Sequence, residues 1–456
     1  MPTSTLNLLQ KYDVPTPRYT SYPTVPCWDF SSIDETIWKR SLLETFRAEN
    51  GELCIYIHLP FCESLCTFCA CTKRITKNHG VENSYISSVL KEWEMYRSLL
   101  PKMPLIKEIH LGGGTPTFFS PDNLIRLING ITKDSIINDD HEFSIEVHPN
   151  YTTEEHIEKL AGIGFNRISV GVQDFDPLVQ FAINRIQSFE RTKEVVDWAR
   201  KYHYKGINID LIYGLPHQTT ESVKYSVDMI CGLMPDRIAF YSYAHVPWKS
   251  KGQRRYTDKD LPSSEQKWKM YNLGKQMLEF AGFLSIGMDH FSLPDDALFF
   301  AASKGKLHRN FMGYTTTSSR LIIGLGASSI SDTGNAYVQN EKDIEKYESN
   351  INQGIFPIVN GHLLSKEDGI IRKKIQELMC NNKSSLDAIS IDPDFMKVAL
   401  SKLLMMQEDG LVIMDKETIQ VTPKGNLFLR NISAAIDAQL WRNKKEMTTH
   451  TFSKAI

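Results

Sequence analysis

Four of the eight cysteines in this chain of 456 residues lie within ten positions, at Cys62, Cys66, Cys69 and Cys71. Thiolates bind soft metals such as zinc, copper(I) and iron–sulfur clusters. Structural zinc usually takes two pairs of ligands separated by a dozen or more residues, and the sequence has no second pair at such a separation. The C-x3-C-x2-C spacing therefore favours a [4Fe–4S] cluster with one iron open to a small ligand, with zinc and unligated thiols as the alternatives.

Residues 112–114 are a run of three glycines that follows an apolar run at 106–111, a predicted strand, and precedes Thr115 and Pro116. Glycine lets the backbone approach a ligand closely, and free N–H and C=O groups on such a turn can hold charged groups. The Gly-Lys-Ser/Thr sequence of a phosphate-binding loop is absent, so we do not expect this turn to bind a nucleoside triphosphate.

Polar side chains also stand at or near the ends of later predicted strands, at Glu146, Gln173, Arg185 and Asp210. A carboxylate at such a place is costly unless it is paired or bound to a ligand, and ribose hydroxyls are suitable partners for Glu146. Each of these residues alone could equally be a hydrogen-bonded core or surface residue. Five arginines are candidate carboxylate ligands, but the sequence does not say which converge: Arg18, Arg185, Arg254, Arg255 and Arg309.

Apolar, β-rich runs that alternate with helical stretches must position these residues. We expect strands at 53–59, 106–111, 142–147, 167–172, 206–212 and 237–243, with helices at 84–99, 123–131, 154–161, 191–202 and 221–233. Repeated strand–helix units with buried strands predict parallel pairing and right-handed crossovers. Because the unusual residues follow strand ends, the pattern favours an α/β partial (β/α)6 TIM-like barrel over a doubly wound sheet.

The barrel is predicted to be the middle of three parts. Residues 1–35 are an extended N-terminal arm because prolines stand at 15, 17 and 23. The barrel with its trailing elements spans 36–350, and 361–456 form a smaller, mainly helical domain with a β-hairpin at 410–422 and a last helix at 427–440. The runs at 283–291 and 321–330 predict further strands or strand–helix turns.

The composition is that of an ordinary soluble globular protein, with 41% hydrophobic and 23% charged residues. The net charge of −2 predicts neither a nucleic-acid nor a membrane partner. The sequence has no secretory signal and no apolar run near the roughly 18 residues that span a bilayer. We expect a cytoplasmic protein, and a monomer.

The motifs together resemble the radical S-adenosylmethionine (SAM) superfamily and, within it, the oxygen-independent coproporphyrinogen III oxidases (dehydrogenases). The resemblance rests on segments at 17–24, 62–71, 171–175, 210–216, 287–291 and 308–316. It implies conversion of two propionate side chains of coproporphyrinogen III to vinyl groups, giving protoporphyrinogen IX in haem synthesis. A 5′-deoxyadenosyl radical from SAM would abstract the hydrogen, and a small electron-transfer protein would be the reductant.

The resemblance also implies roles for individual residues. Cys62, Cys66 and Cys69 would ligate the cluster, and Cys71 would not. Tyr56, Gly113, Glu146 and Ile330 would contact the SAM on the cluster; a second SAM would contact Phe68, Gly114, Thr115, Gln173, Arg185, Asp210 and Ala244. The resemblance does not identify the catalytic residues; from the sequence itself, His58 and Arg18 are the candidates.

Two other classes of protein in the same superfamily are the alternatives. Haem-binding chaperones typically lack both the 17–24 arm and Cys71, and carry a His-Asn-x-x-Tyr segment where this chain has residues 308–314. Radical SAM methyltransferases that act on haem share the cysteine loop but do not need the arm. The full set of motifs therefore favours the oxidase over a binding protein or a methyltransferase.

Overall fold

A curved sheet of parallel strands forms the centre of the computed structural model, which describes residues 5–385, 392–415, 418–443 and 451–455. Six neighbouring strands correspond to those expected: β1 (Glu52–Leu59), β4 (Leu105–Gly113), β5 (Ile136–Val147), β6 (Phe165–Gln173), β7 (Gly206–Tyr213) and β8 (Arg237–Ser242). All five neighbouring pairs are parallel. The prediction of a partial α/β barrel is confirmed.

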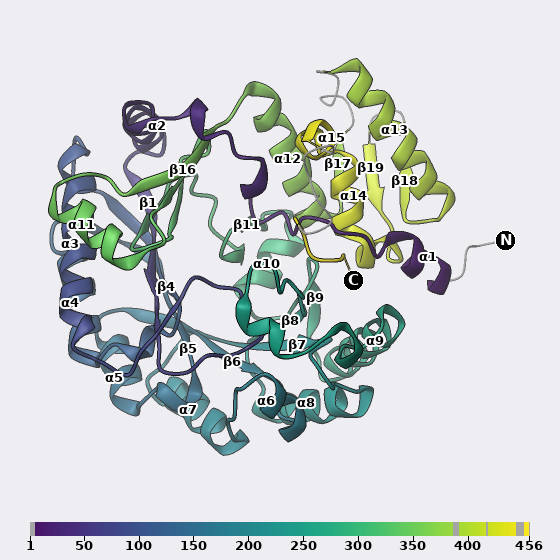
Figure 1. Ribbon diagram of the computed structural model, residues 1–456, viewed down its shortest axis with the longest axis horizontal. Helices are drawn as coiled ribbons and strands as arrows, with labels where there is room; N and C mark the ends of the chain where they lie inside the picture. The colour runs from purple at the N-terminus through teal and green to yellow at the C-terminus, as the bar shows by residue number, and fades with distance from the viewer. Residues whose placement is uncertain (1–4, 386–391, 416–417, 444–450, 456) are drawn as a thin grey trace.

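Helices surround the outer face of this sheet, as Figure 1 shows along its left and lower sides. The crossover helices are α3 (Val81–Leu99), α4 (Pro121–Thr132), α5 (Glu154–Gly162), α7 (Phe189–Lys201) and α8 (Thr220–Leu233). The helices α4, α7 and α8 begin one or two residues before the predicted start because a capping side chain supports the first turn; Thr219, for example, accepts from the Ser222 N–H. No helix within the described ranges is long and apolar enough to cross a bilayer.

The sheet continues past both ends of the six-strand set. Beside β1 lie β13 (Ile322–Leu325), β14 (Ile330–Asp332), β15 (Ala336–Asn340) and β16 (Ile358–Leu363), and beside β8 lie β10 (His290–Ser292) and β9 (Leu284–Ile286). The 283–291 and 321–330 segments thus contribute strands. Since β16 and β9 are the two ends of the sheet order, the barrel is open. Gly361, where we expect the last domain to begin, pairs with Val338 inside this sheet.

The C-terminal domain lies at the upper right of Figure 1. It contains α12 (Lys366–Asn381), β17 (Lys383–Ser385), α13 (Pro393–Glu408), β18 (Val412–Met414), β19 (Thr418–Val421), α14 (Leu429–Ala435) and α15 (Ala438–Arg442). The expected hairpin is β18–β19. The single helix expected at 427–440 is instead broken, because the Asp437 carboxylate accepts from the Leu440 N–H and caps a new helix.

The remaining helices and strands lie outside the barrel repeats and the C-terminal domain. They are α1 (Thr5–Tyr12), α2 (Glu35–Ala48), β2 (Phe61–Cys62), β3 (Arg74–Ile75), α6 (Pro177–Ala182), η5 (Lys251–Arg255), α9 (Ser264–Phe280), α10 (Ala297–Ser303), β11 (His308–Asn310), β12 (Gly313–Thr315) and α11 (Ile344–Asn352).

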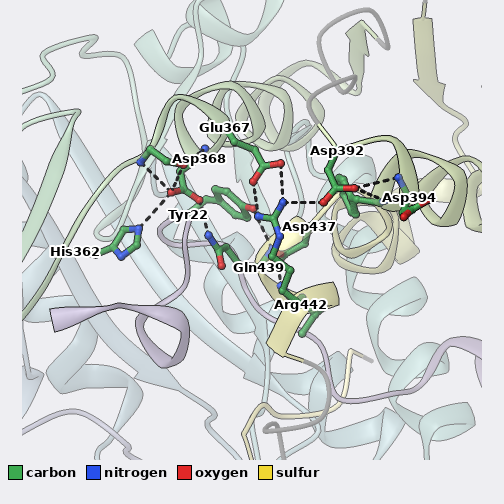
Figure 2. Close-up of polar contacts among 12 residues, drawn as sticks. Tyr22, His362, Glu367, Asp368, Asp392, Asp394, Asp437, Gln439 and Arg442 are labelled. Carbon is green, nitrogen blue, oxygen red and sulfur yellow. Dashed lines mark hydrogen bonds and ion pairs between the residues drawn. The ribbon is translucent and has the colours of Figure 1, made fainter. Parts of the chain in front are cut away.

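The N-terminal arm lies between the barrel and the C-terminal domain (Figure 1). It is not extended throughout, because α1 is helical and packs Leu8 and Leu9 into the C-terminal core. The Arg430 guanidinium then holds the arm by donating to the Pro17 carbonyl at 3.1 Å. Figure 2 shows Tyr22 among the polar residues of that domain, where its hydroxyl accepts from the Gln439 N–H at 3.4 Å. The arm is thus fixed to the domain that follows the barrel.

Candidate active site

Four cysteines that follow β1, Cys62, Cys66, Cys69 and Cys71, line one cavity of about 780 Å³ at the carboxyl ends of the strands. Polar groups approach their sulfur atoms. The Thr115 hydroxyl donates to Cys62 Sγ at 3.4 Å, and Arg185 Nη1 donates to Cys66 Sγ at 3.5 Å. Donors to sulfur, and a cation among them, compensate the negative charge that thiolates carry in an iron–sulfur centre.

The thiols differ in their acidity. A hydrogen bond from Cys71, together with the Lys73 ammonium, lowers the pKa of Cys69 to about 6, whereas burial raises the pKa of Cys62 to about 11. Among the described residues, no three His, Cys, Asp or Glu side chains are placed to share a single metal ion. A cube of four irons binds each thiolate through a different iron, so its ligands stand further apart. The cysteines and their donors therefore fit a cluster better than a single zinc.

The glycine turn after β4 brings backbone into the same cavity. Gly113 has a φ of +114°, and a Cβ there would lie 2.7 Å from the His58 imidazole. A Cβ on Gly114 would lie 2.6 Å from the carbonyl carbon of Pro60. Only glycine fits at these two positions, so the turn can present its N–H and C=O groups to a ligand at close range.

Glu146 lies at the end of β5 and borders the cavity beside this turn. Its carboxylate is 3.1 Å from His110 Nε2 and accepts from the Gly113 N–H at 3.3 Å. Burial acts to raise the pKa of Glu146, but His110 and the backbone N–H outweigh it and hold the pKa below its ordinary value. A carboxylate that stays ionised suits an acceptor for hydroxyl or ammonium groups.

Gln173 of β6 and Asp210 of β7 line the same cavity, as does Arg185 from the segment between α6 and α7. Gln173 has a φ of 73°, a left-handed conformation that is uncommon for a residue with a side chain. Arg185 donates to the Gly171 carbonyl. Burial and the neighbouring Glu146 raise the pKa of Asp210 to about 6. Residues on or after five strands, β1, β4, β5, β6 and β7, thus meet at this cavity, because parallel strands place their carboxyl ends at one edge.

A second cavity of about 900 Å³ lies in the barrel interior and shares Glu146, Ser169 and Asp210 with the first. The β11–β12 hairpin contributes Met312 and Tyr314 to its lining. The two cavities therefore adjoin at these three residues, and the second is a space able to hold part of a larger molecule.

Comparisons with known proteins agree with this arrangement. A sequence profile of the Radical SAM superfamily matches residues 56–230. The chain is 38% identical over 441 residues to the oxygen-independent coproporphyrinogen III oxidase of Pseudomonas aeruginosa, covering 95% of each chain. It is also 38% identical over 459 residues to the enzyme of that name from Escherichia coli, covering 99% of this chain and 98% of the other. The chain belongs to the oxygen-independent coproporphyrinogen III oxidase family.

A solved structure of this family has the same fold. Coproporphyrinogen III oxidase from Escherichia coli, described as a radical SAM enzyme, superposes with a TM-score of 0.88 at 35% identity, covering 96% of this chain and 99% of that one. Membership of the oxygen-independent coproporphyrinogen III oxidase family implies a [4Fe–4S] cluster and SAM as cofactors.

Of the other residues that the family resemblance assigned to SAM, Phe68 lines the cavity, whereas Tyr56, Ile330 and Ala244 do not line it. Tyr56 donates to or accepts from His58 Nδ1 at 3.0 Å and pairs with Gly324 of β13. Gly324 in turn stands against the backbone of Ile330. Gln253 links Phe68 and Ala244, because its Nε2 donates to the carbonyls of both residues, at 2.7 and 3.2 Å.

Two residues that the sequence analysis did not select also line the first cavity. Burial and the nearby Arg185 lower the pKa of His148 to about 2, so its imidazole is neutral. Lys73 Nζ donates to the Cys69 carbonyl at 3.0 Å. Strand alternation could have selected His148, two residues after Glu146; no local signal distinguishes Lys73 from other surface lysines.

The candidate arginines divide into two groups. Arg18 Nη2 donates to the Ser242 carbonyl at 2.6 Å, at the carboxyl end of β8, and the Arg18 carbonyl accepts from Arg309 Nη1 at 2.9 Å. Arg185 lines the first cavity. Arg254 and Arg255 are exposed in η5 and line neither cavity. The structure of this oxidase therefore brings Arg18, Arg185 and Arg309 to the barrel mouth and leaves the other two arginines outside it.

Proposed function

We propose that this chain converts two propionate side chains of coproporphyrinogen III to vinyl groups and so produces protoporphyrinogen IX in anaerobic haem synthesis. The observation that carries the proposal is the junction of the two cavities at Glu146, Ser169 and Asp210. This junction lets a reaction that begins beside the cysteines reach a substrate side chain in the barrel interior. The names of the relatives supply the substrate.

Each propionate loses a hydrogen atom from its β-carbon, carbon dioxide and one electron, which passes to an acceptor. When bound, the cluster and SAM supply an electron and a carbon radical that takes up the hydrogen atom. The residues of the chain bind and orient the cofactors and the substrate. Arg18 offers a guanidinium at the end of β8 that suits a carboxylate, and His58 is held neutral because burial lowers the pKa of its imidazole.

We assign the cluster to Cys62, Cys66 and Cys69, the three cysteines of the family spacing. All three line the cavity, and Cys62 and Cys66 receive polar donors. We assign SAM to the glycine turn and the strand ends beside it, with Glu146 as the acceptor for ribose or ammonium groups. A second SAM would use Gln173, Arg185 and Asp210. We further propose a cytoplasmic monomer that receives electrons from a small electron-transfer protein.

The test is an anaerobic product assay. Reconstituted protein with SAM, dithionite and coproporphyrinogen III should yield protoporphyrinogen IX and 5′-deoxyadenosine. A haem-binding chaperone would instead bind haem tightly and leave coproporphyrinogen III unchanged. That result would overturn the proposal.

A further inference from the structure

The short helix α6 is apolar on two faces, although only one is covered. Val179 and Ile183 are buried against Tyr243 and Tyr256. On the other side, Leu178 and Phe181 are 60% and 64% exposed. Residues at spacing i, i+3 lie on one face of a helix, so these two side chains form a continuous apolar surface. Packing of α6 on the barrel thus accounts for Val179 and Ile183 and leaves Leu178 and Phe181 largely exposed.

Two neighbours extend this surface towards the cysteine loop. Leu65, between Cys62 and Cys66, is 38% exposed, and Ile186 is 61% exposed. We call Leu65, Leu178, Phe181 and Ile186 the α6 patch. Asn184 Nδ2 donates to the Leu65 carbonyl at 2.8 Å, which joins the end of α6 to the loop.

The α6 patch lies directly against the backbone that carries Cys66. The Thr67 N–H donates to the Ile183 carbonyl at 2.9 Å, and the Thr67 hydroxyl donates to the Ala182 carbonyl at 3.1 Å. Cys66 therefore stands between two residues, Leu65 and Thr67, that are bonded to the α6 segment. A protein bound on the patch would rest beside the proposed cluster ligand, outside the cavity that we assign to SAM.

Positive charge lies beside the α6 patch. The turn η5 is fixed to the same loop, because Ser250 Oγ donates to the Cys69 carbonyl at 2.9 Å. Its Lys251, Arg254 and Arg255 are exposed, and none forms an ion pair with another described residue. The Arg255 guanidinium lies 5.6 Å from the centre of the Phe181 ring. Residues 251–260 carry four cationic side chains against the carboxylates of Asp258 and Asp260, and this local excess of positive charge contrasts with the net charge of −2 for the whole chain.

We propose that the α6 patch and η5 form the docking surface for a small acidic electron-transfer protein. The inference rests on the proposed function, which requires reduction of the cluster. One electron leaves the reduced carrier and enters the cluster, and no group is transferred. An exposed aromatic residue beside unpaired cations suits a brief encounter, since the ring anchors the contact while the charges speed association with an acidic partner.

A second copy of this chain is a poorer occupant. A twofold contact places the same surface on both subunits, so the unpaired cations of η5 would approach one another. An acidic carrier pairs with these charges instead. Weak redox encounters also bury little surface, which matches the small size of a patch of four side chains.

The test compares two reductants in the full-length, reconstituted enzyme. Reduced flavodoxin, an acidic one-electron carrier, serves as the protein donor, and dithionite serves as the small donor. The variants are Arg254→Glu with Arg255→Glu, and Phe181→Ala. Matched controls are Arg40→Glu with Arg47→Glu on α2, which lies far from α6 in Figure 1, and Phe280→Ala, whose side chain is 95% exposed at the end of α9.

We expect the patch variants to need about tenfold more flavodoxin for half-maximal formation of 5′-deoxyadenosine, and the controls to match wild type. With dithionite, all proteins should react at the same rate. Equal flavodoxin dependence in variants and controls would overturn the docking surface, as would a dimer that Phe181→Ala dissociates. Failure of wild type to cleave SAM with dithionite would instead count against the proposed function.

Discussion

The hydroxyl of Tyr19 in the N-terminal arm donates a hydrogen bond to the carboxylate of Asp437, 2.9 Å away in the C-terminal domain. Asp437 is buried and also caps α15. Residues separated by more than four hundred positions thus hold the arm across the barrel mouth. Arg18, the neighbour of Tyr19, is placed beside β8 by this contact.

Asp437 should make stability depend on pH. Burial raises the pKa of its carboxyl from 3.8 to about 6, so the folded chain binds a proton more tightly than the unfolded chain does. Its contribution to stability is greatest below pH 3.8 and is lost as the pH rises through about 6. Asp437→Asn keeps the cap, because Oδ1 still accepts from the Leu440 N–H, and it places an amide N–H beside the Tyr19 hydroxyl, which can accept it, but it cannot ionise.

We therefore expect Asp437→Asn to gain up to about 3 kcal/mol relative to wild type between pH 4 and pH 7. Urea unfolding of both proteins at the two pH values measures this difference. Asp394→Asn, an exposed change at the start of α13, is the control and should follow wild type. Identical pH dependence in wild type and Asp437→Asn would contradict the assignment.

Arg18→Ala should lower the rate of protoporphyrinogen IX formation by about tenfold or more, because loss of a positioning contact misplaces the substrate. Cluster absorbance and SAM cleavage without substrate should stay unchanged, since the side chain reaches Ser242 rather than the cysteines. Arg18→Lys keeps the charge but not the forked donor, so its rate of product formation should lie between those of wild type and Arg18→Ala. Unchanged product formation in Arg18→Ala would remove the arm from the active site.

Gly113→Ala should impair both stability and SAM binding. A methyl group there would meet the His58 ring at 2.7 Å, and the φ of +114° disfavours any side chain. We expect a loss of about 1–3 kcal/mol in the free energy of unfolding, measured with urea, and weaker SAM binding, measured by equilibrium dialysis. The control is Gly162→Ala, where a Cβ would have no neighbour within 4 Å. Similar behaviour of the two variants would refute the steric argument.

The cysteines should separate into ligands and a non-ligand. Cys62→Ala, Cys66→Ala and Cys69→Ala should each lose the iron–sulfur absorbance after anaerobic reconstitution, because each thiolate would hold a different iron. Cys71→Ala should retain it, as should Cys231→Ala on α8, far along the chain from the loop. Loss of the cluster in Cys71→Ala would make Cys71 a fourth ligand and close the open iron.

The sequence alone predicted the strands of the barrel and the residues at their carboxyl ends. Buried parallel strands are continuous apolar runs, and the side chains that follow them must meet at one edge once the strands pair in order. Cys66, Gly113, Glu146 and Asp210 could therefore be assigned to one place from local pattern. The spacing of the cysteines likewise predicted an iron–sulfur site without any tertiary information.

Tertiary contacts decided what no local pattern contains. Residues 5–12 form a helix because Leu8 and Leu9 can be buried only against the distant C-terminal core. Asp437 ends one helix and begins another because its carboxylate is held between Leu440 and Tyr19. Arg18 reaches β8, while Arg255 lies outside on Phe181. Nothing in the local sequence distinguishes these leucines, arginines and this aspartate from others of their type. Their roles depend on partners that lie far away in the sequence and come together only when the chain folds.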